Sequence, residues 1–236
     1  MDKYLHSNRK AAEALLKKLD PSYRQRWEIY DDILKHLTGS GARWLDGGCG
    51  RNIAIEEFPC DITIGIDVYR HPDALHNAPH HLITGTLENL PFSDSVFTLV
   101  TLNTVVEHFE NPAVVLKEIF RVLRPGGHVL IHTTNKTSPV IMLGKLFPES
   151  LRLRLMKKAF GAQDRDVFRT YHRLNTISAL RTIEGFDVLE FHAIQDLNWS
   201  NRVIFLILLA FHIITKIPGL WRLRTNFVVL LKKKKS

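Results

Sequence analysis

The feature that most constrains this sequence is a glycine-rich turn directly after a short apolar run, Trp44-Leu45-Asp46-Gly47-Gly48-Cys49-Gly50. The apolar run predicts a strand that ends in the carboxylate of Asp46. The glycines after it allow a tight turn and let the backbone approach a ligand that side chains would exclude. A helix predicted to follow would present free backbone N–H groups at its start. The turn therefore predicts a ligand site, and the alternative is a strand–helix turn that binds nothing.

Short apolar runs alternate with amphipathic stretches along residues 41–135. The runs predicted as strands are 43–46, 62–67, 81–84, 97–101 and 128–132, and the clearest helix between them is 113–123. Such alternation predicts an α/β fold with a doubly wound, Rossmann-like parallel sheet and helices on both faces. Ligands of such sheets bind at the carboxyl ends of the strands. Asp67 ends the second predicted strand there, so it is placed to accept both hydroxyl protons of a ribose.

The spacing of the glycines separates two classes of nucleotide site. A dinucleotide fingerprint, G-x-G-x-x-G, counted from Gly48 would need glycine where Ile53 stands. The acid-x-G-x-G form instead resembles motif I of the class I S-adenosylmethionine-dependent methyltransferases, of the small-molecule or lipid type. Three later segments are similar to further motifs of that family, in the same order: 85–97, 103–112 and 123–128. The resemblance covers about residues 25–135, and apolar runs at 186–192 and 227–231 fit the family's antiparallel C-terminal hairpin in a seven-stranded sheet.

The resemblance implies S-adenosylmethionine as the cofactor and assigns residues to it by position. Asp46 would serve the methionine amino group, Asp67 the ribose hydroxyls and Asn103 the methionine moiety. Thr86 and Leu87 would border the adenine. The backbone lining would come from Gly47, Gly48, Cys49 and Gly50. Two positions depart from the family pattern: Asn52 replaces a third glycine, and Thr86 replaces an acid, so its hydrogen bond to the adenine would be weaker.

Candidates for catalysis lie in two segments. His108 follows the fourth predicted strand and is a candidate base, although a Glu-His pair at this place in the family is often structural or on the cofactor side. Tyr171, His172 and Arg173 belong to a polar and aromatic segment after the fifth strand. They are candidates for holding or deprotonating an acceptor, with Tyr171 and Arg173 as substrate residues. The alternative is that this segment only precedes a helix at 175–184 that Asn175 or Thr176 caps.

The spacing of the histidines and the small number of cysteines limit the alternatives. The histidines His71, His76, His80 and His81 lack the spacing of a zinc site and read better as a solvated loop, so no metal is predicted. Two cysteines cannot form a disulfide framework, and residues 1–18 are too polar for a secretory signal. These observations predict a cytoplasmic location. Attachment to the inner face of a membrane is a further prediction.

The prediction of membrane attachment rests on the C-terminal part of the chain. The net charge is +8, yet residues 141–236 alone hold 17 basic and 7 acidic side chains. A basic amphipathic stretch lies at 149–160, and 203–217 is almost wholly apolar but too short to span a bilayer. These features predict contact with an anionic membrane surface, to which Lys232–Lys235 could add. The alternatives are a buried helix at 203–217 and a lysine run that merely protects an edge strand.

The whole sequence is interpreted as one methyltransferase domain. Its parts are N-terminal helices (1–40), a cofactor-binding half (41–135), a substrate lid region (136–185) and terminal strands (186–236) that contain the apolar insertion 203–217. The predicted reaction is O-methylation of a small or lipid-linked acceptor at a membrane surface. An RNA methyltransferase is the first alternative, disfavoured because the basic residues alternate with aliphatic runs. A non-catalytic binding module of the same fold is the second.

Overall fold

The computed structural model describes residues 2–50, 58–71, 81–145, 169–199 and 201–235. Its contacts divide the chain into two compact units, and each unit is assembled from three separate segments. The helical unit comprises Met1–Glu28, Asn135–Phe168 and Ala193–Asn226. The sheet unit comprises Ile29–Thr134, Arg169–His192 and Phe227–Ser236. The single domain predicted from the sequence stays a prediction, and the two units are described separately below.

The sheet has seven strands in the order β3-β2-β1-β4-β5-β7-β6. The neighbours from β3 to β5 pair in parallel, and β7 and β6 complete the sheet as an antiparallel C-terminal hairpin. This arrangement confirms the predicted fold class. The strands are β1 Gly39–Gly47, β2 Cys60–Asp67, β3 His81–Thr84, β4 Phe97–Asn103, β5 Leu123–Thr134, β6 Phe186–Ile194 and β7 Asn226–Lys233.

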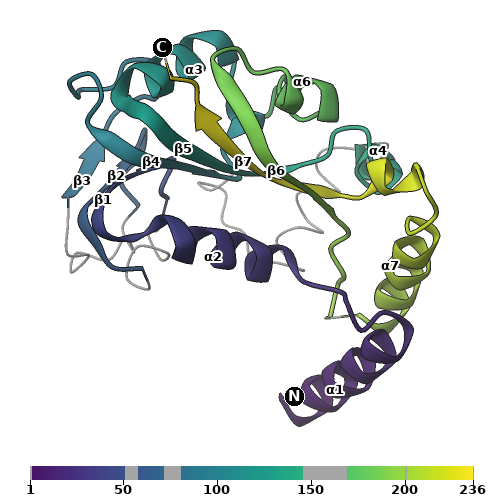
Figure 1. Ribbon diagram of the computed structural model, residues 1–236. Helices are drawn as coiled ribbons and strands as arrows, with labels where there is room; N and C mark the ends of the chain where they lie inside the picture. The colour runs from purple at the N-terminus through teal and green to yellow at the C-terminus, as the bar shows by residue number, and fades with distance from the viewer. Residues whose placement is uncertain (1, 51–57, 72–80, 146–168, 200, 236) are drawn as a thin grey trace. The chain divides into compact units, whose positions relative to one another are not determined.

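Helices cover both faces of the sheet, as Figure 1 shows, with α2 on one face and α3 and α6 on the other. Their bounds are α2 Arg26–Leu37, α3 Pro112–Val122 and α6 Ile177–Arg181, and a short 3₁₀ turn, η2, spans Val106–His108. The central strands are apolar on both sides because both faces are covered. Leu45, Val100 and Leu130 are accordingly buried without solvent exposure. This packing fixes the carboxyl ends of β1, β2 and β4 at one edge of the sheet.

Three boundaries differ from the sequence predictions. β1 begins at Gly39, before the strand predicted at 43–46 and inside the range 1–40 predicted as N-terminal helices, and the Gly39 N–H donates to Pro59 O at 2.8 Å. The helix predicted at 175–184 is only Ile177–Arg181, and its N-cap is Thr176, whose Oγ1 accepts from the Ala179 N–H. The N-terminal helices, predicted over 1–40, end at Leu37 with α2. In each case the predicted element exists, and only its ends differ.

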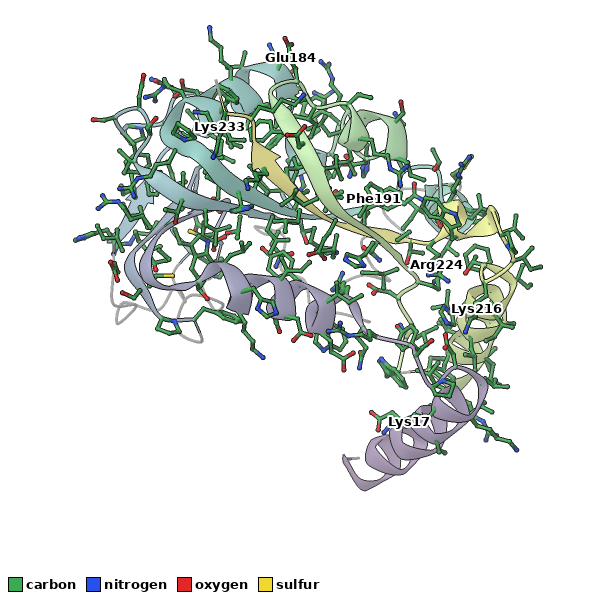
Figure 2. All side chains as sticks on the ribbon, viewed as in Figure 1. Lys17, Glu184, Phe191, Lys216, Arg224 and Lys233 are labelled. Atoms are coloured by element: carbon green, nitrogen blue, oxygen red, sulfur yellow. The ribbon has the colours of Figure 1, made fainter. Side chains whose placement is uncertain are left out.

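The C-terminal lysines do not protect an edge strand, which corrects one of the two roles considered for them. β7 lies between β5 and β6, so it is an interior strand. Lys233, labelled in Figure 2, is 6% exposed. Its ammonium donates to Phe120 O at 2.6 Å and to Leu123 O at 2.7 Å, and it lies 4.1 Å from the centre of the Phe120 ring. It therefore caps the last turn of α3, where backbone carbonyls lack helical partners.

The helical unit packs around a small core of its own. Its elements are α1 Asp2–Leu19, α4 Pro139–Lys145, α7 Arg202–Ile214 and the 3₁₀ turn η4 Leu220–Leu223. Leu16 of α1 packs with Phe205 and Leu209 of α7, and Trp199 lies against Phe205 with ring centres 5.2 Å apart. Within the described ranges, no helix combines the length and the apolar character needed to cross a bilayer. The basic stretch predicted at 149–160 lies outside the described residues.

Candidate functional site

Asp46 ends β1 as a buried carboxylate, with 8% of its surface exposed. One of its oxygens accepts a hydrogen bond from Thr101 Oγ1 at 2.6 Å, and that hydroxyl in turn accepts from the Trp44 indole N–H at 2.7 Å. Burial raises the pKa of Asp46 to about 6, the nearby charge of Asp67 adds to the rise, and the Thr101 hydrogen bond opposes it. The fold thus holds a carboxylate with an elevated proton affinity at the ligand edge of the sheet.

The glycine turn after Asp46 is held against β2 by its backbone. The N–H groups of Gly48 and Cys49 both donate to Ile66 O, at 2.7 and 3.2 Å. Gly48 has φ +68°, and a Cβ built there would lie 2.5 Å from Val105 Cγ2. Only glycine fits this position, because both the backbone conformation and the neighbouring valine exclude a side chain. Arg51 and Asn52, which follow, lie outside the described residues.

Asp67 ends β2 next to this turn. One carboxylate oxygen accepts from the Gly50 N–H at 2.9 Å and the other from the Tyr69 N–H at 3.0 Å. The side chain is half-buried and lines a small hollow together with Gly50, Tyr69, His71 and Thr84, among others. An ionised carboxylate has about four acceptor sites, so two hydrogen bonds leave it capacity for a diol.

The segment predicted to border an adenine follows β3. Thr86 is exposed, and its Oγ1 accepts from the Glu88 N–H at 3.2 Å. Leu87 is buried and lies 3.1 Å from where a Cβ on Gly47 would stand. Residues of α3 hold the end of this segment by its backbone: Glu118 accepts from the Leu90 N–H at 2.8 Å, and Arg121 donates to Leu90 O at 2.9 Å.

Asn103 ends β4 and is bound by a histidine that sequence reasoning missed. His132, 4% exposed on β5, has its Nδ1 2.7 Å from Asn103 Oδ1 and 3.2 Å from Thr104 Oγ1. Because the amide oxygen can only accept, Nδ1 carries the proton and donates. The backbone of Thr104 turns here with φ 62°, which is unusual for a β-branched residue. The pairing depends on β4 and β5 lying side by side, so no local sequence pattern could reveal it.

His108, Tyr171 and His172 are brought together, although 63 positions separate His108 from Tyr171 in the sequence. The N–H groups of Tyr171 and His172 donate to Glu107 O, at 2.7 and 3.0 Å. His108 Nδ1 lies 2.9 Å from Arg169 O, so it donates there and a neutral imidazole carries its lone pair on Nε2. The residues after β4 and those before α6 are therefore neighbours near the carboxyl end of β4.

A buried network supports this site and was also missed. Glu107 is 3% exposed and accepts from Thr133 Oγ1 at 2.9 Å. Asn175, fully buried, donates to Thr133 Oγ1 at 2.6 Å and to Thr134 O at 3.0 Å. Asn175 therefore ties the segment to β5, and of the two caps considered, Asn175 and Thr176, it is Thr176 that caps the helix.

The histidines weighed as a metal site are not gathered in the described structure. His71 is buried with its ring edge-on to Tyr69, at 6.4 Å between centres. His81 is exposed and begins β3, at the end of the strand opposite the ligand edge. His76 and His80 lie outside the described residues. Across the part of the chain that is described, no three His, Cys, Asp or Glu side chains are arranged to hold a metal ion.

Comparison with known proteins identifies the family. The profile of a family described as a methyltransferase domain matches residues 45–131, which contain the glycine turn, Asp67 and Asn103. The chain belongs to the class I S-adenosylmethionine-dependent methyltransferases. An S-adenosylmethionine dependent methyltransferase from Mesorhizobium loti shares its fold, with a TM-score of 0.54 and 17% identity over 88% of this chain and 97% of that one.

Two relatives of this methyltransferase are similar in sequence, and only one of them has a name that states an activity. The uncharacterized protein MJ1123 of Methanocaldococcus jannaschii is 30% identical over 70% of this chain and 71% of its own length. A malonyl-[acyl-carrier protein] O-methyltransferase of Serratia marcescens is 27% identical over 53% of each chain. The chain thus spans about half the length of that named relative, so an acceptor is not transferred from its name.

S-adenosylmethionine is the cofactor of this methyltransferase, as the family implies, and the residues present fit it. At Gly48 the missing Cβ lets Val105 pack against the main chain, and at Gly50 no described atom stands within 4 Å of a built Cβ, so a ligand can approach the backbone at Gly50. A carboxylate stands at the end of each strand beside the turn, Asp46 on β1 and Asp67 on β2. Opposite charge and paired acceptors are what an ammonium group and a ribose diol require.

Proposed function

We propose that this chain transfers the methyl group of S-adenosylmethionine to an oxygen of a small or lipid-linked acceptor at a membrane surface. The observation that carries the cofactor half of the proposal is the convergence of Asp46, the Gly48 turn and Asp67 at one edge of the sheet. Asp46 would accept from the methionine ammonium and Asp67 from both ribose hydroxyls.

The remaining cofactor contacts follow from the positions of three segments. The backbone of Gly47, Gly48, Cys49 and Gly50 would line the methionine and ribose. Leu87, held against Gly47, would cover one face of the adenine, and Thr86 would offer it a hydroxyl. Asn103 would contact the methionine moiety, and its hydrogen bond to His132 orients the amide so that its NH₂ group can point to the ligand.

The chemistry asks little of the protein beyond alignment and one proton transfer. When bound, S-adenosylmethionine supplies an activated methyl group on a sulfonium, so proximity accounts for most of the rate. An acceptor hydroxyl must lose its proton as the new O–C bond forms. His108 can take that proton on Nε2, because Nδ1 is engaged by Arg169 O. Tyr171 and His172 lie beside it and would position the acceptor.

The surface of α7 supports the membrane part of the proposal. Phe205, Leu209 and His212 face the core of the helical unit, whereas Val203, Ile207 and Ile214 are 65%, 63% and 52% exposed. The helix therefore leaves an apolar stripe exposed. It is not buried on all sides, as the alternative of a buried helix at 203–217 would require. Exposed apolar patches of this kind mark interaction surfaces.

Basic residues accompany the stripe. Arg202 is the first residue of α7, Lys216 follows its end, and Arg222 and Arg224 lie in and after η4. Figure 2 shows Lys216 and Arg224 near the end of α7. Lys216 is 43% exposed although it pairs with Asp20 at 2.8 Å. Basic residues beside an apolar helix face suit an anionic lipid surface.

Calorimetric titration of the purified chain with S-adenosylmethionine tests the cofactor half. We expect saturable binding that Asp67→Ala abolishes. Asp61→Ala is the matched control, because Asp61 is exposed on the same strand and should leave binding unchanged. A folded wild-type chain that does not bind would contradict the proposal and favour a non-catalytic module.

Flotation with vesicles tests the membrane half. We expect flotation with phosphatidylglycerol-containing vesicles and its loss in Ile207→Glu. Leu189→Glu serves as the control, since Leu189 is 49% exposed on β6 of the sheet unit. Salt-sensitive RNA binding without flotation would support the RNA methyltransferase instead.

A further inference from the structure

The side chains of two arginines lie over the ring of Tyr171, in the segment that contacts His108. The guanidinium carbon of Arg169 lies 5.0 Å from the centre of the Tyr171 ring, and that of Arg173 lies 5.8 Å from it. Both arginines are exposed. In the described part of the chain neither guanidinium forms an ion pair with a carboxylate. The carboxylate of Glu110 instead accepts from the Tyr171 hydroxyl at 3.1 Å.

The backbone under these arginines is fixed rather than a free surface loop. Glu107 O accepts from the N–H groups of Tyr171 and His172, and Arg169 O accepts from His108. His172 has φ 51°, so the backbone between the two arginines adopts the left-handed conformation that few non-glycine residues take. Asn175 anchors the end of the segment to β5. The two positive charges are thus held in place next to the candidate base before any ligand arrives.

A guanidinium stacked on an aromatic face keeps its N–H edge available for hydrogen bonds in its own plane. Two such groups on one ring offer paired donors to an anion with several oxygens, and bidentate pairing of this kind suits phosphate and carboxylate groups. A neutral alcohol or an aliphatic chain would gain little from these charges. Arginine stacking on tyrosine for structural reasons alone would leave no response to anions.

We propose that Arg169 and Arg173 bind an anionic oxygen group of the acceptor, a phosphate or a carboxylate, and place the methyl-accepting atom beside His108. This inference rests on the proposed function, because it names the class of acceptor for the same site. It narrows the acceptor from any small or lipid-linked molecule to one that carries a phosphate or carboxylate near the hydroxyl that is methylated.

Anion binding can be measured without knowing the acceptor. The ¹⁵Nε resonances of the arginine side chains would be followed in the intact chain during titration with inorganic phosphate and, separately, with acetate, at constant ionic strength. We expect saturable shifts of the Arg169 and Arg173 signals. Arg173→Gln should weaken the response of Arg169 about tenfold or more, since one of two charge-assisted partners is lost. The stronger of the two titrations assigns phosphate or carboxylate.

Arg124→Gln is the matched control, because Arg124 is exposed in β5 near the amino end of that strand, away from the ligand edge. It should leave the titration unchanged. Arg169→Gln provides a second variant and keeps the backbone carbonyl that His108 uses. Unsaturable shifts, or equal responses in Arg173→Gln and wild type, would overturn the inference. S-adenosylmethionine binding in the same samples separates the two failures. Binding without an anion response refutes only this inference. An anion response without S-adenosylmethionine binding refutes the proposed function, and with it the acceptor role of the two arginines.

Discussion

Replacing Gly48 by alanine should destabilise the chain far more than the same change at Gly50, although both glycines belong to one turn. Both have positive φ, +68° and +51°. An alanine in this left-handed region costs roughly 1–2 kcal/mol. At Gly50 no atom stands within 4 Å of the built Cβ in the described structure, so that strain is the whole cost.

At Gly48 a second cost is added. The built Cβ lies 2.5 Å from Val105 Cγ2 and 2.8 Å from Val105 Cγ1, well inside van der Waals contact. Forcing an extra methyl group into a packed site costs roughly 1–3 kcal/mol. The free energy of unfolding should therefore fall by about 2–5 kcal/mol in Gly48→Ala and by about 1–2 kcal/mol in Gly50→Ala.

Urea unfolding followed by circular dichroism measures both values, and Val105→Ala tests their cause. In the Val105→Ala background both Cγ atoms are gone and only Val105 Cβ remains close, at 3.2 Å, so Gly48→Ala should then cost only a little more than Gly50→Ala. The double-mutant cycle should give a coupling of about 1–3 kcal/mol between residues 48 and 105. Equal losses for the two glycine variants, or a coupling near zero, would refute the steric argument.

Two further predictions concern single ionisable groups. Because burial raises the pKa of Asp46 to about 6, calorimetry should show S-adenosylmethionine affinity falling about tenfold per pH unit below pH 6 as the carboxylate is protonated. Asp46→Asn should bind S-adenosylmethionine weakly, and its affinity should not change with pH in this way. A wild-type affinity that stays constant from pH 5 to 7 would be inconsistent with the role of Asp46. Lys233→Met should lower the free energy of unfolding by about 2–4 kcal/mol, since it leaves two carbonyls at the end of α3 without their donor. Lys235→Met, at an exposed lysine, is the control. Equal urea midpoints for the two variants would argue against the capping role of Lys233.

The fold could be predicted because its signals are local. Alternating apolar runs predicted the strands, and the acid followed by glycines marked where the first strand ends, so the order of elements followed from the sequence. The ends of elements were harder to predict. Gly39 lies in the range predicted as N-terminal helices, but it begins β1, because its N–H donates to Pro59 O. Pairing between distant segments outweighs the local preference of glycine there.

Residues of the candidate site could be predicted only where the local sequence around them identifies their position. Asp46 and Asp67 each follow an apolar run, so both were found. His132 and Asn175 act by contacting residues 29 and 42 positions away. Lys233 is one of four consecutive lysines that no pattern distinguishes, and only the close approach of α3 selects it. Such residues become visible once strand order is known, because the order decides which side chains are neighbours.

The strand order also has a consequence for how the chain folds as it is synthesised. β7 is the last of the seven strands along the chain, yet it occupies the place between β5 and β6. Until it emerges from the ribosome, β5 and β6 cannot be joined, and each presents an open row of backbone groups. We therefore expect nascent chains that stop before Asn226 to aggregate or to recruit chaperones, while chains that contain the eight residues of β7 can close the sheet.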